Sequence, residues 1–221
     1  MPKLFFCSDL HLGHLSILKY ESCRLKAVWQ KYYKKSCSYK TFAFHFNTAF
    51  ERKSEEDLVW LREILNHHDD LIINNWNAVV SKHDTVWFLG DFCMGGRSTI
   101  KAYAQRLHGI IRMVKGNHDN YPNKVYLEGG FRSVSEHPVV LKQKYILSHA
   151  PLDAFIAGKG CGDFINIFGH VHSSTDVRTS SKKHHCVCIE RQKLSPLRLL
   201  DVENFQRDTL AFDNKNRHKN K

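Results

Sequence analysis

Five short polar clusters, each directly after an apolar run, constrain the fold of this chain more than any other feature. The clusters are Asp9-Leu10-His11, Gly90-Asp91, Gly116-Asn117-His118-Asp119, Ser148-His149 and Gly169-His170-Val171-His172. The apolar runs before them, at 4–7, 85–89, 110–114, 145–147 and 164–168, have the length of buried strands. We therefore expect five strand ends at one edge of a sheet, carrying the residues of a single site.

The first half of the chain predicts an α/β arrangement. Strands at about 3–8, 85–89 and 110–114 alternate with helices at about 54–80 and 98–107, which favours parallel neighbours. Ser54 and the acidic residues after it are typical of a helix start. The cluster at 67–70, His67-His68-Asp69-Asp70, is expected to bend or interrupt the first of these helices.

The second half indicates another sheet. After Gly129 and Gly130 the pattern changes to short strands, at about 131–134, 139–141, 144–147, 165–168, 185–189 and 197–200. We expect these to form a mixed or antiparallel sheet that stacks on the first, with helices outside. The predicted fold class is an α/β four-layer αββα sandwich of two stacked mixed sheets.

The chain of 221 residues is long enough for one domain, which we place at 1–213, followed by a basic disordered tail at 214–221. An insert at about 21–53 is rich in aromatic residues and lysines. We interpret it as a helical lid whose aromatics pack on the main body, with a surface for a nucleic acid strand as the alternative. The net charge of +11 favours anionic partners, with solubility alone as the other explanation.

Other classes of protein are disfavoured. The seven cysteines are odd in number and lack a CxxC pair, so neither a zinc ribbon nor a disulfide framework is indicated. No segment approaches the roughly 20 apolar residues of a membrane span, and the N-terminus is unlike a signal peptide. We expect no membrane association and a cytoplasmic location.

The clusters offer the ligands of two metal ions. Asp9 and His11 lie two residues apart, so both side chains point to one side of a strand end. Asp91 has two carboxylate oxygens and can bridge two cations, and Gly90 lets the backbone turn sharply beside it. Asn117 adds an amide oxygen. The remaining imidazole ligands are His149 and His170 for the second ion and His172 for the first.

This donor set, with nitrogen and oxygen and no thiolate, suits Mn²⁺, Fe²⁺ or Zn²⁺ better than Ca²⁺. Two such ions clamp a phosphoryl group and activate a water molecule. Each cluster alone is also typical of a turn, a cap or an exposed strand. Their joint occurrence, each after an apolar run, favours metal binding.

Four further residues are candidates for contact with the substrate. His118 can hydrogen-bond the phosphate and protonate the leaving alcohol, an effect worth roughly 10²–10⁴-fold in rate. Asp119 is predicted to orient that imidazole by accepting its other N–H. His14 and Arg97 are predicted to bind substrate phosphate. A core histidine and a solvated loop arginine are the alternative interpretations of these last two.

In this order, the motifs DLH, GD, GNHD, SH and GHVH resemble those of the calcineurin-like metallophosphoesterase superfamily. The surrounding SDLHLGH, NWN, LGDF and SHAP segments are similar to those of its small bacterial and phage members. The resemblance covers about 5–201 and implies the αββα fold. It implies one ion held by Asp9, His11, Asp91 and His172, another held by Asp91, Asn117, His149 and His170, and His118 as catalytic acid. The insert at 21–53 departs from it.

The predicted function is hydrolysis of phosphoester bonds with two divalent ions, Mn²⁺ first and Fe²⁺, Zn²⁺ or Ni²⁺ as alternatives. The basic charge and the aromatic insert favour a phosphodiesterase that acts on a nucleotide or small nucleic acid. The alternatives are a phosphomonoesterase, including a protein or nucleotide phosphatase, with the same site, and a catalytically idle nucleic-acid-binding module. The sequence does not indicate an oligomeric state.

Overall fold

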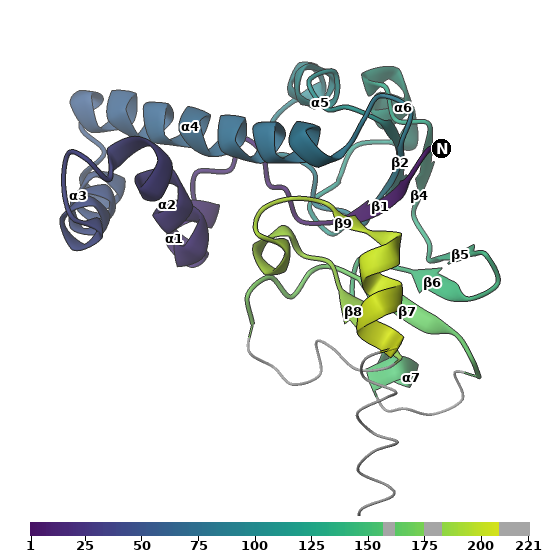
Figure 1. The fold of residues 1–221 in the computed structure, drawn as a ribbon. Coiled ribbons are helices and arrows are strands. Elements are labelled where there is room, and N and C mark those ends of the chain that lie inside the picture. The colour runs from purple at the N-terminus through teal and green to yellow at the C-terminus, as the bar shows by residue number, and fades with distance from the viewer. Residues whose placement is uncertain (157–161, 175–182, 208–221) are drawn as a thin grey trace, which may run out of the picture.

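The structure, a computed structural model, describes residues 1–156, 162–174 and 183–207. It contains two mixed β-sheets flanked by helices (Figure 1). The predicted α/β fold with two stacked sheets is confirmed. The tail predicted at 214–221 lies outside the described residues.

The first sheet has the strand order β4-β3-β2-β1-β9. Strands β1 to β4 run parallel, and β9 pairs antiparallel with β1. The bounds are β1 Leu4–Cys7, β2 Thr85–Phe88, β3 Ile110–Val114, β4 Ser133–Ser135 and β9 Leu197–Arg198. Because β1, β2 and β3 are parallel neighbours, the loops that follow them leave the same edge of the sheet.

The second sheet has the order β5-β6-β7-β8. Strand β5 is antiparallel to β6, while β6, β7 and β8 are parallel. The bounds are β5 Val139–Leu141, β6 Tyr145–Leu147, β7 Ile165–Phe168 and β8 His184–Cys186. The predicted strand at 185–189 ends early, because the chain turns into the 3-10 helix η3, Ile189–Gln192. This turn brings Glu190 to His172.

Alternation along β1 explains how the layers are held together. Phe5 and Cys7 point into a core shared with the helices, whereas Phe6 points into a second core shared with Tyr145 and Ile167 of the other sheet. The period of two along a strand assigns one apolar face to each neighbouring layer. Helices α5, Arg97–Ala104, and α6, Asn123–Gly129, cover the first sheet (Figure 1), and residues 199–207 form a further helix.

Helix α4, Glu55–Val79, begins as predicted with Ser54 as N-cap and a complete capping box with Asp57. The predicted interruption at 67–70 is wrong, because the helix is continuous through those residues. His68 and Asp69 are buried and hydrogen-bonded to each other, and Asp69 also accepts from the Tyr103 hydroxyl. Tertiary partners thus satisfy two polar side chains that an isolated helix would expose.

The predicted insert at 21–53 is helical and packs along α4, forming a helical arm that we define as residues 17–79 (Figure 1). Phe42 and Phe46 are buried in the core, while Phe44 is 67% exposed. Before α4, the arm contains the helices α1 Ile17–Tyr20, α2 Ser22–Val28, the π-helix η1 Trp29–Tyr33 and α3 Tyr39–Arg52. A short α7, Asp153–Ile156, follows β6. None of the described helices has the length and apolar character needed to cross a bilayer.

Candidate metal centre

The predicted ligands meet in two groups at the ends of strands. One group is Asp9, His11 and His172, and the other is Asp91, His149 and His170. Within each group the ligand atoms lie within 4.8 Å of one another. The residues come from the loops after β1, β2, β6 and β7, so segments as far apart as Asp9 and His172 share one site.

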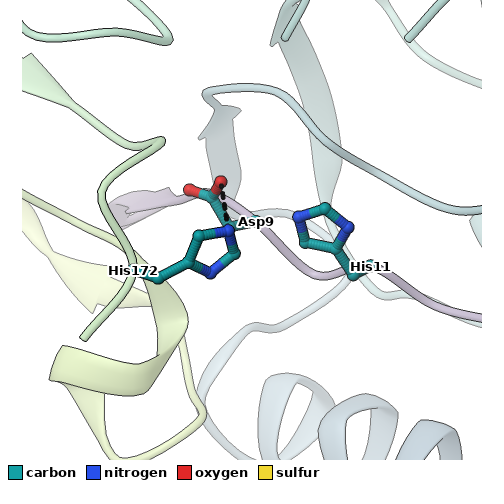
Figure 2. Close-up of side chains that lie close together, drawn as sticks. All are labelled: Asp9, His11 and His172. Carbon is teal, nitrogen blue, oxygen red and sulfur yellow. Dashed lines mark ion pairs between the residues drawn. The ribbon is translucent and has the colours of Figure 1, made fainter. Parts of the chain in front are cut away.

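The first group is drawn in Figure 2, where Asp9 and His11 follow β1 and His172 approaches from the loop after β7. His172 Nε2 lies 3.7 Å from Asp9 Oδ1. Asp9 Oδ1 and His11 Nε2 are buried and have no hydrogen-bond partner in the described part of the chain. A buried carboxylate oxygen without a donor is costly, and a cation between these atoms removes that cost.

The second group brings an amide oxygen and imidazole nitrogens close together. His149 Nδ1 lies 2.8 Å from the Leu89 carbonyl oxygen, so this nitrogen carries the proton and Nε2 carries a lone pair. That lone pair faces Asn117 Oδ1 at 2.9 Å and His170 Nδ1 at 3.1 Å. Asn117 Oδ1 is also 3.0 Å from His170 Nδ1. With His170 in the tautomer that leaves Nδ1 without a proton, these atoms are all acceptors that converge on one point, and they fit a metal ion.

Asp91 connects the two groups. Its Oδ2 atom lies 3.6 Å from His11 Nε2 and 3.4 Å from His149 Nε2. Its Oδ1 atom accepts a hydrogen bond from the His118 backbone over 2.9 Å. One carboxylate oxygen between two ligand groups is the arrangement expected of a bridging aspartate. Two divalent ions held by nitrogen and oxygen therefore fit the residues present.

The directions of the pKa shifts are consistent with metal ligands. Burial lowers the pKa of His11 and of His170, so both imidazoles are neutral near pH 7 and offer lone pairs. Burial raises the pKa of Asp9 in spite of the nearby His149 and His172. Burial alone would lower the pKa of His172, but Glu190 and Asp9 outweigh it and raise the pKa. At a pH below this raised pKa, metal binding at His172 releases a proton.

Glycine is required where the loops cross. Gly90 has φ +91°, and a Cβ there would lie 2.4 Å from the Gly116 nitrogen and 2.6 Å from His149 Nδ1. At Gly116 a Cβ would lie 2.2 Å from Asp91 Oδ1. At Gly169 it would lie 2.5 Å from Asp9 Oδ2. The glycine before each of these clusters thus leaves space for the ligands of a neighbouring loop.

His118 is exposed beside the two groups, with its ring centroid 5.3 Å from that of His11. Among the described contacts its imidazole has ring neighbours and no hydrogen bond, so it is free to meet a substrate. The carboxylate of Asp119 accepts from the backbone nitrogens of Asp91, Phe92 and Gly116 at 2.6, 3.1 and 2.8 Å. These bonds fix the ligand loops, whereas the described bonds of Asp119 do not reach the His118 imidazole as predicted.

The two predicted phosphate-binding residues differ in position. His14 lies next to the first group, with Nδ1 3.1 Å from His11 Nδ1, and burial lowers its pKa. Arg97 is exposed at the first residue of α5, and none of its described contacts reaches a ligand. His14 is thus brought to the site, while a role for Arg97 stays a prediction.

Three residues around the ligands were not predicted from the sequence. Glu190 Oε1 accepts from His172 Nδ1 over 2.9 Å. Arg24 of α2 binds Glu190 and the carbonyl oxygen of Asp9. Cys188 Sγ lies 3.2 Å from Asp9 Oδ2. In the sequence, Arg24 is one of two arginines in the insert and Glu190 is one of two glutamates after the last cysteine, and neither position indicates its partner.

Burial alone would raise the pKa of Glu190, but the charge of Arg24 and the bond from His172 lower it to about 2. Glu190 is therefore a carboxylate at neutral pH. It can accept a hydrogen bond from His172 Nδ1 at neutral pH and so keep His172 Nε2 directed toward the cation.

Comparisons with known proteins agree with this geometry. Residues 2–209 match the sequence model of the calcineurin-like phosphoesterases. An uncharacterized protein of Methanocaldococcus jannaschii is 26% identical over 176 residues, which cover 79% of this chain and 72% of that protein. The gene 66 protein of Mycobacterium phage L5 is 36% identical over 122 residues, covering 54% of this chain and 41% of that protein.

A solved structure supports the fold. The crystal structure of a protein of unknown function from Aquifex aeolicus superimposes with a TM-score of 0.56 at 18% identity. The superposition covers 93% of this chain and all of the other (100%). At this level of identity the likeness concerns the arrangement of the backbone.

Proposed function

The chain belongs to the calcineurin-like phosphoesterase family, and from that premise we propose that it is a dinuclear phosphodiesterase acting on nucleotides or small nucleic acids. The observation that carries the proposal is the position of Asp91, whose Oδ2 atom lies within 3.6 Å of one ligand group and 3.4 Å of the other. A site for one ion would need no such shared oxygen. We propose Mn²⁺ as the metal, with Fe²⁺, Zn²⁺ and Ni²⁺ as alternatives.

The proposed ligands divide into two sets that share Asp91. Asp9, His11 and His172 complete one set, and Asn117, His149 and His170 complete the other. When bound, a pair of divalent ions neutralises charge on the phosphoryl oxygens and lowers the pKa of a water molecule. The protein fixes the ligands in place before substrate arrives, because the loops are tied to each other by backbone bonds such as Asp9 N to Gly90 O, at 2.9 Å.

His118 is the proposed catalytic acid. Its backbone is held by Asp91 Oδ1, and its exposed imidazole has no described hydrogen bond that would compete with a substrate. It can donate a proton to the leaving oxygen when the ester bond breaks. His14, beside His11, is placed to hydrogen-bond a phosphoryl oxygen, and Asp119 keeps the loop of His118 against that of Asp91.

The preference for a nucleotide or nucleic acid rests on charge. The net charge is +11, and the helical arm presents exposed lysines on α1, α2, η1, α3 and the segments between them. Tyr20 and Phe44, also on the arm, are 75% and 67% exposed. Lysines beside exposed aromatic rings suit phosphates and bases together. The same charge attracts any anionic ester, so a phosphomonoesterase is the second candidate.

The test is metal-dependent hydrolysis of two simple esters, bis(4-nitrophenyl) phosphate and 4-nitrophenyl phosphate, with Mn²⁺ added to metal-free protein. We expect turnover of the diester, stopped by EDTA and restored by Mn²⁺. A faster monoester reaction would favour the phosphatase. Hydrolysis of neither ester, combined with tight and salt-sensitive binding of an oligonucleotide, would assign the chain to the idle binding module.

His118→Asn tests the proposed acid within the same assay. Turnover should fall by roughly 10²–10⁴-fold while the metal content stays at the wild-type value, because the side chain is placed outside both ligand groups. Unchanged turnover would remove His118 from the reaction. A loss of metal would assign it to the ligands instead.

A further inference from the structure

Arg24 is a fully buried arginine in α2 of the helical arm, and its guanidinium touches the first ligand loop. Nη2 donates to the Asp9 carbonyl oxygen over 2.5 Å, and Nη1 donates to the Leu10 carbonyl oxygen over 2.8 Å. Asp9 has a left-handed backbone, with φ 59°. The two bonds hold the main chain in this unfavourable conformation at the point where its side chain meets the metal site.

The same guanidinium binds Glu190. Arg24 Nε and Nη2 donate to Glu190 Oε1 at 2.7 and 2.5 Å. The two side chains are 0% and 1% exposed, so water does not weaken the pair. A planar guanidinium can serve two carbonyls and a carboxylate at once, which the single ammonium of a lysine cannot reproduce. The pair joins the arm to η3 across 166 residues of sequence.

Glu190 passes this constraint to a metal ligand. Its Oε1 atom, the one that Arg24 binds, also accepts from His172 Nδ1 over 2.9 Å. The bond fixes the imidazole tautomer and leaves His172 Nε2 facing Asp9 Oδ1, 3.7 Å away. Arg24 therefore reaches Asp9 through its backbone and His172 through Glu190.

We infer that Arg24 is a positioning residue of the metal centre, which sets the affinity of the ion held by Asp9, His11 and His172. Its described contacts do not include Asn117, His149 or His170, so the second ion is outside its reach. The inference rests on the proposed dinuclear site. According to this inference, a residue of the helical insert holds in place the side chains that bind one of the two ions.

The experiment is a calorimetric titration of metal-free protein with Mn²⁺, comparing wild type with Arg24→Met. Methionine has similar length and no donors. We expect two ions to bind to the wild type. In Arg24→Met one ion should bind roughly 10–100-fold more weakly, as is typical when the partner of a ligand is lost. The other ion should keep its wild-type affinity. A folded variant that binds both ions like the wild type would overturn the inference.

The matched control is Arg52→Met. Arg52 also forms a two-pronged ion pair in the arm, to Asp57 at 2.7 and 2.6 Å, but it lies at the end of α3 and contacts no ligand. The Arg52→Met variant should bind both ions with wild-type affinity. Weakening of the same ion in Arg52→Met would mean that general loosening of the arm, rather than the Arg24 contacts, changes the affinity, and the inference would be wrong.

A double-mutant cycle separates a relay from two independent effects. Glu190→Gln keeps an oxygen that can accept from His172 but loses the charge. If both residues act through His172, the double variant Arg24→Met/Glu190→Gln should lose no more affinity for this ion than the more affected single variant. Additive losses would contradict the relay. Should Arg24→Met fail to fold, Arg24→Lys takes its place in the titration and the cycle.

Binding and turnover are read separately, so the two proposals can fail separately. If the wild type binds two ions and hydrolyses neither ester, the proposed function fails and the affinities still decide the role of Arg24. If the wild type binds no Mn²⁺, both proposals fail. In Arg24→Met, weaker binding of one ion with the other bound as in the wild type supports the inference, whatever the turnover.

Discussion

The ligand loops and the helical arm are built in opposite ways. Five of the residues proposed as ligands have left-handed backbone angles, although none is glycine: Asp9 59°, His11 49°, Asp91 60°, His170 72° and His172 47°. Across the helical arm, residues 17–79, Lys53 at the end of α3 has the one positive φ. The loops therefore carry backbone strain that the arm avoids.

The difference indicates where the free energy of folding comes from. Left-handed angles of non-glycine residues cost of order 1–3 kcal/mol each and persist only where the surroundings fix them. In the loops the fixing contacts are backbone bonds between segments, such as His11 N to Asp91 O at 3.1 Å, and the side chains of Asp119 and Arg24. The arm instead relies on buried apolar side chains and regular helices. Changes in the loops should alter function first, and changes in the arm should alter stability first.

Asp91→Asn should produce the largest effect. In the proposed dinuclear site the oxygen shared by the two ions loses its charge, and several kcal/mol of charge stabilisation are lost with it, so kcat/KM should fall by about 10³-fold or more. The free energy of unfolding of the metal-free protein should stay equal or rise, because a buried charge is removed from a strained loop. Steady-state kinetics and urea unfolding measure the two quantities. A large loss of stability without loss of turnover would reverse the comparison.

Phe46→Ala tests the arm. Phe46 is 0% exposed in the core, and its truncation should lower the free energy of unfolding by about 3–5 kcal/mol. Affinity for Mn²⁺ in the folded protein should not change, since the described ring contact of Phe46 is with Phe50 of the same helix and not with a proposed ligand. Phe44→Ala, on the same helix but at a 67% exposed position, is the control and should stay within about 0.5 kcal/mol. Equal losses in both variants would show that the burial argument fails.

Features that depend on residues adjacent in the chain could be predicted from the sequence, whereas contacts between residues far apart in the chain could not. The strand ends and the ligands were recognisable because an apolar run and its polar cluster are adjacent in the chain, as at Phe88 and Asp91. The start of α4 was recognisable because Ser54 and Asp57 lie within one helical turn. These local patterns predicted two stacked sheets, but two strands expected in the second sheet, at about 131–134 and 197–200, pair in the first sheet as β4 and β9. The predicted ligand residues lie together in two groups, and their role as ligands stays a prediction.

The failures have one physical cause, which is that the partner lies far away in sequence. A break was predicted at 67–70 because four polar residues interrupt the apolar stripe, yet Asp69 accepts hydrogen bonds from the Tyr103 hydroxyl and the Gly13 nitrogen. Arg24 and Glu190 are separated by 166 positions, and the sequence near either residue does not predict that they pair. Asp119 was predicted to orient its neighbour His118, and the sequence did not reveal that its carboxylate also accepts from the backbone nitrogens of Asp91 and Phe92.

The stability of the second sheet, which contains β8, should depend on pH. Burial and the neighbouring His184 lower the pKa of His185 in β8 to about 4. In the unfolded chain the pKa is about 6.5, so the unfolded state takes up a proton first as the pH falls. The stability contribution is complete above pH 6.5 and is lost between about 6.5 and 4, by up to about 3 kcal/mol. Urea unfolding at pH 7.5, 5.5 and 4.5 measures it.

His185→Leu is the control for this loss, because it removes the titrating group and keeps an apolar side chain against Phe205. The wild type should lose more stability than the variant on acidification. The arm should respond at lower pH, since the bond from Arg52 keeps the pKa of Asp57 below its usual value. Its contribution is present above the ordinary pKa and is lost as the pH falls further. Parallel curves for wild type and His185→Leu would refute the assignment.

The smallest expected effect is at the start of α4. Ser54 Oγ accepts from the Asp57 nitrogen at 3.2 Å, and Asp57 Oδ2 accepts from the Ser54 nitrogen at 3.0 Å. Ser54→Ala removes one half of this box and should lower the free energy of unfolding by about 1 kcal/mol, whereas Ser54→Asp, which can still cap, should lose much less. Turnover and Mn²⁺ affinity should be unchanged in both variants. A change in either would mean that α4 transmits events at its first turn to the ligand loops, and that the arm supports the site through more than Arg24.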